Sequence, residues 1–153
     1  EVIVTSSSDD KLQRAKALGA DHLVNYKKTG EWSKAVREIT GGRGGDHVVE
    51  VGGAGTLAES LKSIRVGGHV SIIGVLAGPV KDLEIRLIMG PNAKVKGITV
   101  GSREQFEAMC RAIALHKIKP VIDKTFPFAA AKEALSHMAG QSHFGKIAID
   151  LTT

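Results

Sequence analysis

The sequence predicts an α/β protein built on a doubly wound parallel sheet, and three observations carry that prediction. Apolar runs rich in β-branched residues alternate with amphipathic helical runs at intervals of roughly 20 to 30 residues, which is typical of βαβ units. The opening run Val2–Val4 is apolar on both faces, which indicates a strand covered by helices on both sides. Small polar residues or glycines follow several runs, at the strand ends where ligands bind in such folds.

Stop signals divide the first half of the chain into elements. Ser8 is a suitable N-cap for the helix after the opening strand, with Asp9 and Asp10 in its first turn, and Gly19 ends that helix. A second helix at Glu31–Thr40 has apolar residues at positions i, i+3, i+4 and i+7, so one of its faces is expected in the core. The other strands expected in this half are His22–Tyr26 and Asp46–Val51.

The second half continues the alternation and then changes character. A helix through Leu57, Leu61 and Ile64 leads, by way of a turn at 66–68, into a fourth strand at His69–Val75. Glycine and proline residues then bracket a looser stretch. A later helix is expected to bury the face formed by Phe106, Met109, Cys110 and Ile113. The other elements expected are helices at Leu83–Met89 and Ala129–Ala139, a fifth strand at Val95–Val100, extended segments at Pro120–Asp123 and Phe126–Phe128, and a closing strand at Lys146–Leu151.

Composition excludes several classes of protein. With 153 residues, 42% of them hydrophobic and 24% charged, the chain suits a globular domain with its own core rather than a disordered segment. No stretch approaches the roughly 20 apolar residues of a membrane span. The net charge of +5 is spread over helix faces among few aromatic residues, which argues against nucleic-acid and membrane partners. One cysteine and no visible signal segment favour a reducing compartment, the cytoplasm.

The glycine run Gly52–Gly55 is the first candidate for a ligand site. It follows a strand, so it is either a turn that approaches a ligand or a tight connection to the next helix. The run EVGGAG also resembles the first glycine-rich motif of methyltransferases, although here two βα units precede it. The six histidines form no HxxxH pair and have no cysteine nearby, so we predict no metal site. Cys110 is expected to pack inside its apolar helical stripe.

Four segments resemble one known family, in collinear order and over essentially the whole chain. They are VIVTSSSDDKLQRAKALGAD, GGRGGDHVVEVGGAGTLAESLKSIRVGGHVSIIGVLAG, KVKGITVGSREQFEAM and HFGKIAIDL. Together they are similar to the cofactor-domain half of medium-chain alcohol dehydrogenases and quinone oxidoreductases. The resemblance implies a Rossmann-like fold and an enzyme that transfers hydride between a nicotinamide cofactor and an alcohol, aldehyde, ketone or quinone.

The resemblance also implies a preference for NADP over NAD. Ser6 stands where NAD-dependent members hold an acidic residue against the adenosine ribose, and an acid there would repel a 2′-phosphate. Ser6 and Ser7 can donate hydrogen bonds to that phosphate, and Lys11 can add positive charge. The alternative is that the serine run only caps the following helix.

Further cofactor contacts follow from the same comparison with the family. Gly52 is implied to lie beside the nicotinamide ribose, and Lys146 matches a basic position that reaches the pyrophosphate. A lysine there could equally be a solvated charge at the end of a strand. The family positions whose backbone faces the nicotinamide carboxamide correspond to Ile73, Gly74, Val75, Ile98 and Val100.

Departures from the family pattern set the remaining expectations. The GroES-like catalytic domain with its zinc ligands, the first Rossmann strand and the glycine-rich loop have no counterpart in this chain, which starts without Met. Zinc is therefore expected only in an intact parent, no catalytic or metal-binding residue is assigned here, and the chain alone is expected to be inactive. Residues 1–115 are expected to form a partial NAD(P)-binding domain, and residues 116–153 a segment that returns towards the catalytic domain. The alternative is that the two pack as one single domain.

The missing strand should be central in the order 3-2-1-4-5-6. The sheet must then close its second strand onto its fourth or admit a strand from elsewhere, because unpaired central edges are costly. The resemblance also implies a homodimer through the strand Val95–Val100. Two other function classes stay open: an S-adenosylmethionine-binding, methyltransferase-like domain and a non-catalytic nucleotide-binding module.

Overall fold

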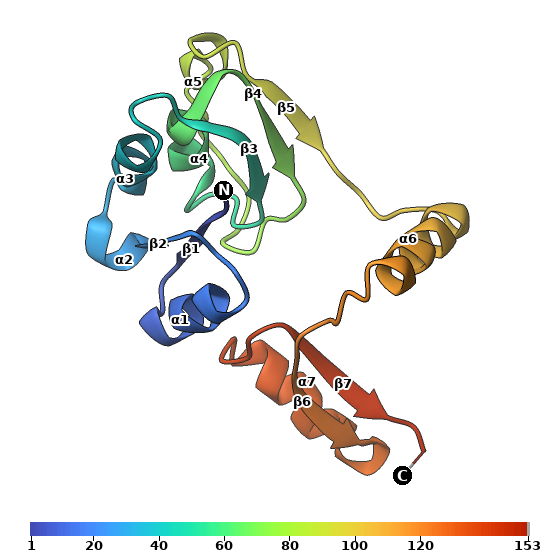
Figure 1. The fold of residues 1–153 in the computed structure, drawn as a ribbon. Helices are drawn as coiled ribbons and strands as arrows, with labels where there is room; N and C mark the ends of the chain where they lie inside the picture. The colour runs from blue at the N-terminus through green and yellow to red at the C-terminus, as the bar shows by residue number, and fades with distance from the viewer. Residues whose placement is uncertain (153) are drawn as a thin grey trace. The chain divides into compact units, whose positions relative to one another are not determined.

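The computed structural model describes residues 1–152, and they form two compact units (Figure 1). Unit 1 comprises Glu1–Val100 and unit 2 begins at Gly101. Both units are built of helices and parallel strands, as the alternation of apolar runs predicted. The boundary expected at residue 115 is a different one, because it separates the cofactor-binding domain from the segment that returns towards the catalytic domain. It stays a prediction. None of the helices in the described residues is long and apolar enough to cross a bilayer.

The first part of unit 1 is a two-stranded parallel sheet with its helices. It contains β1 (Ile3–Ser6), α1 (Asp9–Ala17), β2 (His22–Asn25), α2 (Tyr26–Thr29) and α3 (Trp32–Ile39). Ser8 caps α1 as predicted, because its hydroxyl accepts a hydrogen bond from the Lys11 amide at 3.4 Å. The core of this part is formed by Val24 on β2 with Trp32 and Val36 on α3. The single turn α2 was not predicted.

The second part of unit 1 is a three-stranded parallel sheet in the order β3-β4-β5. Its core is a cluster of buried side chains from α4 and β4, against which residues of β3 and β5 pack. The cluster consists of Leu57, Leu61, Ile64 and Val70. The elements are β3 (Gly45–Glu50), α4 (Leu57–Ser63), β4 (Ile64–Ile72), α5 (Arg86–Met89) and β5 (Lys94–Gly97).

The expected turn at 66–68 lies inside β4 and not before it. The strand starts at Ile64, immediately after α4, and its register against β3 shifts between Gly45 and His47. Gly67 has a φ of 69°, and its amide donates to the Pro91 carbonyl at 2.8 Å instead of to β3. The glycines therefore produce an irregularity within a strand, which sequence patterns do not distinguish from a turn.

The two sheets of unit 1 are separate in the described residues, although the neighbours within each sheet match the expected order. β1 pairs with β2 and β3 pairs with β4, and no pairing joins β1 to β3. Closure of the expected second strand onto the fourth, here β1 onto β3, is therefore wrong. The alternative, a strand supplied from elsewhere, stays a prediction. Packing of α3 against α4 connects the two parts instead.

Unit 2 contains one long helix and a small βαβ unit. Its elements are α6 (Arg103–Leu115), β6 (Ile122–Pro127), the 3₁₀ turn η1 (Phe128–Ala130), α7 (Ala131–Ala139) and β7 (Lys146–Asp150), with β6 and β7 paired in parallel. Ser102 and Gln105 form a capping box at the start of α6. Asp123 on β6 joins this strand to α7 and to the loop before β7. Its carboxylate accepts from the Phe144 amide at 3.1 Å and lies 3.2 Å from Nε2 of His137.

The buried face expected on α6 is wrong for the described structure. Phe106 is 60% exposed and Met109 is 49% exposed, Cys110 is exposed, and Ile113 is only half-buried. The helical spacing of these residues is as predicted, but no other element of unit 2 packs closely on α6 in the described residues. Periodicity identifies the apolar side of a helix and not what covers it.

Candidate functional site

The loops after β3 and β4 are joined to each other by backbone hydrogen bonds. Glycines make this possible, because a Cβ on Gly74 would lie 2.8 Å from the Val51 carbonyl oxygen and one on Gly53 would lie 2.8 Å from that of Gly78. Together the loops form one rigid surface at the carboxyl ends of two neighbouring strands. The hydrogen bonds run from Ile73 N to Glu50 O (2.9 Å), Leu76 N to Val51 O (3.2 Å), Ala77 N to Gly52 O (2.7 Å) and Ala54 N to Gly78 O (3.2 Å).

The carboxylate of Glu50 lies beneath this surface and is almost fully buried, at 2% exposure. Oε1 accepts from the amides of Gly52 (2.7 Å) and Gly53 (3.0 Å) and from the Thr56 hydroxyl (2.5 Å), and Oε2 accepts from the Ser60 hydroxyl. Burial raises the pKa of Glu50, but these hydrogen bonds outweigh it and hold the pKa below its ordinary value. The buried group is therefore an ionised and fully bonded carboxylate.

The end of the β4 loop offers unused backbone groups to a ligand. Among the described residues, the amides of Gly74 and Val75 and the carbonyls of Ile73 and Ile98 make no hydrogen bond within the chain. Ile98 is beside them, because its own amide donates to the Ile72 carbonyl at 2.8 Å. Donors and acceptors on one exposed edge suit a flat primary amide, which has both. These residues therefore fit the nicotinamide carboxamide that the family resemblance implies.

Val100 and Gly52, the other two residues expected near the nicotinamide, do not share this open backbone edge. Val100 lies beyond the end of β5 and is 96% exposed. Gly52 is in the joined loops, but its amide and carbonyl are both engaged, with Glu50 and Ala77. Gly52 can thus let a ligand approach closely but has no spare amide for it.

The serine run lies at the carboxyl end of β1 and leads into α1. Ser6 Oγ accepts from the Ser8 amide at 3.2 Å, which leaves the proton of the Ser6 hydroxyl available. The Ser7 hydroxyl makes no hydrogen bond among the described residues, whereas Ser8 is occupied as the helix cap. Capping therefore explains Ser8 but not Ser7. Lys11 lies on the first turn of α1.

Three residues near this end were not identified from the sequence as part of a site. The Asp9 carboxylate accepts from Asn25 Nδ2 at 2.7 Å and forms an ion pair with Lys28 on α2. The hydrogen bond from Lys28, supported by that from Asn25, lowers the pKa of Asp9. Lys28 therefore compensates the negative charge of Asp9. The sequence signals this cluster only weakly. Asp9 comes shortly after the first strand, and Asn25 at the end of the second strand is followed by two lysines.

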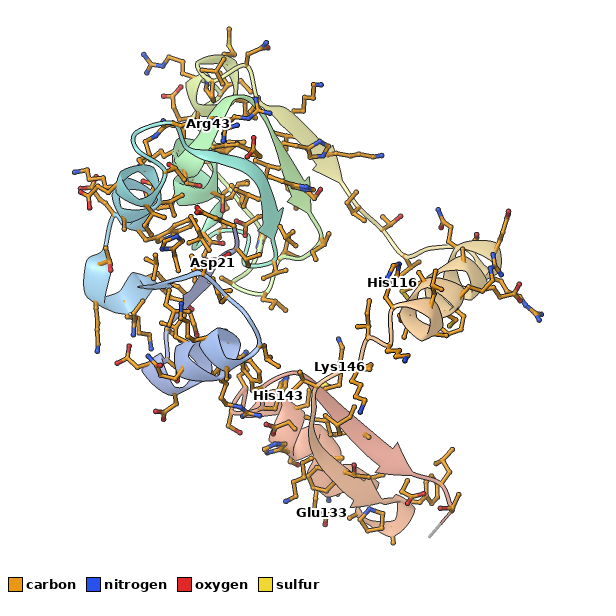
Figure 2. The ribbon with its side chains drawn as sticks, viewed as in Figure 1. Asp21, Arg43, His116, Glu133, His143 and Lys146 are labelled. Carbon is orange, nitrogen blue, oxygen red and sulfur yellow. The ribbon has the colours of Figure 1, made fainter. Side chains whose placement is uncertain are left out.

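Lys146 belongs to unit 2, where it begins β7 (Figure 2). Its amide donates to the Val121 carbonyl at 2.8 Å, and its side chain is exposed. Gly145 precedes it with a φ of 93°, and a Cβ there would lie 2.4 Å from the Val121 carbonyl oxygen. This glycine therefore fixes how the chain enters β7, and the part of Lys146 in pyrophosphate binding stays a prediction.

The candidates fall into two groups within unit 1. One group is Ser6, Ser7 and Lys11 at the end of β1, and the other is Gly52, Ile73, Gly74, Val75 and Ile98 at the ends of β3, β4 and β5. The described residues contain no cluster of three or more histidine, cysteine, aspartate or glutamate side chains able to hold a metal ion. Sequence reasoning missed Glu50, Thr56 and Ser60, although an acid near the end of an apolar strand, one residue before two glycines, was a usable signal.

Comparison with known proteins gives the family. The zinc-binding dehydrogenase family matches residues 1–114. A zinc-type alcohol dehydrogenase-like protein of Schizosaccharomyces pombe is 44% identical over 98% of this chain and 44% of its own length. The crystal structure of a putative alcohol dehydrogenase from Sinorhizobium meliloti 1021 superposes with a TM-score of 0.89 at 41% identity, over 99% of this chain and 44% of that one.

A second solved structure, described as an NAD-dependent alcohol dehydrogenase, has a TM-score of 0.89 at 35% identity, again over 99% of this chain and 44% of that one. The chain thus spans less than half the length of these proteins. The match of the family to residues 1–114 includes both groups of candidate residues in unit 1. The chain belongs to the zinc-binding dehydrogenase family, in its α/β cofactor-binding part.

Proposed function

We propose that this chain is the cofactor-binding portion of an NADP-dependent oxidoreductase that transfers hydride between nicotinamide and an alcohol, aldehyde, ketone or quinone. The observation that carries the proposal is the open backbone edge at Ile73–Val75 and Ile98, at the carboxyl ends of β4 and β5. When bound, the cofactor supplies the hydride chemistry. The residues of this chain hold and orient it: backbone groups at this edge contact the carboxamide, and Gly52 permits close approach of the ribose.

The preference for NADP rests on the end of β1. Ser6 and Ser7 have hydroxyl protons to donate to a 2′-phosphate, Lys11 adds charge, and the Asp9 carboxylate is compensated by Lys28. The NAD-dependent structure at 35% identity shows that similar chains can use the other cofactor. The hydrogen-bond donors at the end of β1 are therefore the ground for the NADP assignment. Separately, we propose that Lys146 contacts the pyrophosphate, because it matches a basic position of the family.

Direct titration tests this assignment. The dissociation constants of NADPH and NADH are measured in the intact protein by nicotinamide fluorescence, with S-adenosylmethionine as the control ligand. We expect tighter binding of NADPH than of NADH, and no binding of S-adenosylmethionine. Tighter binding of NADH would contradict the NADP preference, and failure of both nucleotides would contradict the function. After the family assignment, no observation favours the methyltransferase alternative.

The 153-residue chain by itself is proposed to be inactive. The family resemblance assigns none of its residues to the zinc site of the zinc-dependent members or to the substrate site, and a substrate site is needed to place a substrate against the nicotinamide. The test is an NADPH oxidation assay with aldehyde and quinone substrates on the purified chain. Turnover above the rate without protein would contradict the proposal.

The proposed location is a reducing compartment such as the cytoplasm, which the exposed, unpaired Cys110 favours.

A homodimer through β5 is the proposed assembly. β5 is the edge strand of its sheet, and the chain after it exposes Ile98 and Val100. An edge strand with apolar residues beside it can extend its sheet by pairing with a second copy. Sedimentation equilibrium at micromolar concentration is expected to give twice the monomer mass, and a monomer would contradict the proposal.

A further inference from the structure

Glu50 is a buried acid that the proposed function does not use. It is the last residue of β3, and its carboxylate accepts four hydrogen bonds, two of them from the backbone of the following turn. A buried carboxylate is costly unless it is fully bonded, so these partners are needed for it to remain charged. The two hydroxyl donors, on Thr56 and Ser60, come from the start of α4 and its second turn.

The bonds to Glu50 fix the direction in which the turn faces. The amides of Gly52 and Gly53 point inward to the carboxylate, so they are not available to a ligand. The carbonyl of Gly52 is then left to accept from the Ala77 amide at 2.7 Å, which joins the turn to the loop after β4. The backbone of Glu50 adds a further connection, because its carbonyl accepts from the Ile73 amide at 2.9 Å.

We propose that Glu50 is a positioning residue for the cofactor, holding the Gly52–Gly53 turn and, through it, the Ile73–Val75 edge in binding geometry. This inference rests on the proposed function, which assigns that edge to the nicotinamide carboxamide. Glu50 acts by reach, since its side chain is long enough for one oxygen to meet both glycine amides while the other accepts from Ser60 on the second turn of α4. Its charge satisfies the four donors and does not contact the cofactor.

Two substitutions separate reach from charge. Glu50→Gln keeps the length and one acceptor oxygen for Gly52, Gly53 and Thr56, while Ser60 can reverse its role and accept from the new amide. Glu50→Asp keeps the charge but is shorter by one methylene, so its oxygens cannot meet the glycine amides and Ser60 on α4 at the same time. We expect NADPH binding in the intact protein to weaken by about tenfold or more in Glu50→Asp and to stay within about threefold of wild type in Glu50→Gln.

Glu59→Gln is the matched control. Glu59 is another largely buried carboxylate with a full set of donors, the amide and hydroxyl of Ser33 and the ammonium of Lys62, but it joins α3 to α4 away from the turn. Its loss should lower stability and leave the NADPH dissociation constant unchanged. Amide hydrogen exchange at Gly53 and Ala77 provides a readout that does not depend on cofactor. We expect it to accelerate in Glu50→Asp and not in Glu59→Gln.

Each outcome decides the proposal. Wild-type affinity in Glu50→Asp, or equal weakening in Glu50→Gln and Glu50→Asp, would overturn positioning by reach. If Glu50→Asp does not fold, Glu50→Gln alone decides. Weakened NADPH binding in a folded Glu50→Gln would overturn the proposal, and wild-type affinity with wild-type amide exchange would support it. If wild type binds no nicotinamide nucleotide, the proposed function fails, and exchange at Gly53 and Ala77 still decides whether Glu50 holds the two loops.

Discussion

Arg37 on α3 donates a hydrogen bond of 2.9 Å from Nη2 to the carbonyl oxygen of Ile64, the residue at which α4 gives way to β4. Its Nε donates to the Lys62 carbonyl at 2.9 Å, and Nη1 donates to the Gly42 carbonyl at 3.0 Å. One guanidinium thus satisfies carbonyls at the end of α4 and in the loop after α3. Because β1 and β3 do not pair, this connection and that of Ser33 with Glu59 join the two sheets of unit 1.

Replacement of Arg37 should therefore destabilise unit 1 as a whole. We expect Arg37→Ala to lower the free energy of unfolding by about 1.5 to 3 kcal/mol, the usual range for hydrogen bonds to a charged donor. Arg37→Lys should recover little, because an ammonium cannot reproduce the planar fork. Urea denaturation followed by circular dichroism measures the change. Lys34→Ala on the same helix, which removes only an exposed pair with Glu31, is the control and should cost less than about 0.5 kcal/mol.

A negative charge at the end of β1 should reverse the cofactor preference. The carboxylate of Ser6→Asp would stand where the 2′-phosphate is proposed to bind, and repulsion between the two charges should weaken NADPH by about tenfold or more. NADH should be unaffected or bind more tightly, since the carboxylate can accept from the ribose hydroxyls. Ser6→Asn, of similar size without the charge, is the comparison. Equal loss of NADPH affinity in both variants would show that size and not charge is responsible.

Glycine at position 53 is required by its backbone and by its neighbours. Its φ is +84°, and a Cβ would lie 2.8 Å from the Gly78 carbonyl oxygen and 3.0 Å from the Val75 Cα. Gly53→Ala should lower the free energy of unfolding by more than about 2 kcal/mol, from left-handed strain and the forced separation of the two loops. Gly55→Ala is the control in the same turn, because its Cβ would meet only the Ala77 Cβ, at an ordinary 3.5 Å. Equal unfolding midpoints for the two variants would contradict the joined-loop structure.

Local signals in the sequence were enough for most of the elements and for placing several candidate residues at the ends of strands. Ser8 as a cap and glycine runs after strands are read directly from residue types, and the structure confirms the cap on α1 and the interlocked loop after β3. Whether β1 and β3 share a sheet was not readable, because the residue pattern of a strand does not say which strand lies beside it. The bonds of Glu50 depend on Ser60, ten positions away, and only the folded chain shows that its carboxylate meets both glycine amides.

The stability of the protein should depend on pH through Glu50. The pKa of this carboxyl is lowered in the folded chain, because its hydrogen bonds outweigh the opposing effect of burial. In the unfolded chain it returns to about 4.3. A group whose pKa is depressed by folding stabilises the native state above its unfolded pKa, and that contribution is lost as the pH falls through the folded pKa. Wild type should therefore lose unfolding free energy as the pH falls below about 5.

Glu50→Gln cannot ionise, so this part of the pH dependence should be missing from it. We expect the difference in unfolding free energy between wild type and Glu50→Gln to be largest near neutral pH and to narrow below about pH 4.3. Urea midpoints measured by circular dichroism from neutral pH into the acid range test this. Glu133→Gln, at an exposed position of α7 in Figure 2, is the control and should follow wild type. Parallel curves for wild type and Glu50→Gln would mean that the carboxylate is not ionised and bonded as the structure shows.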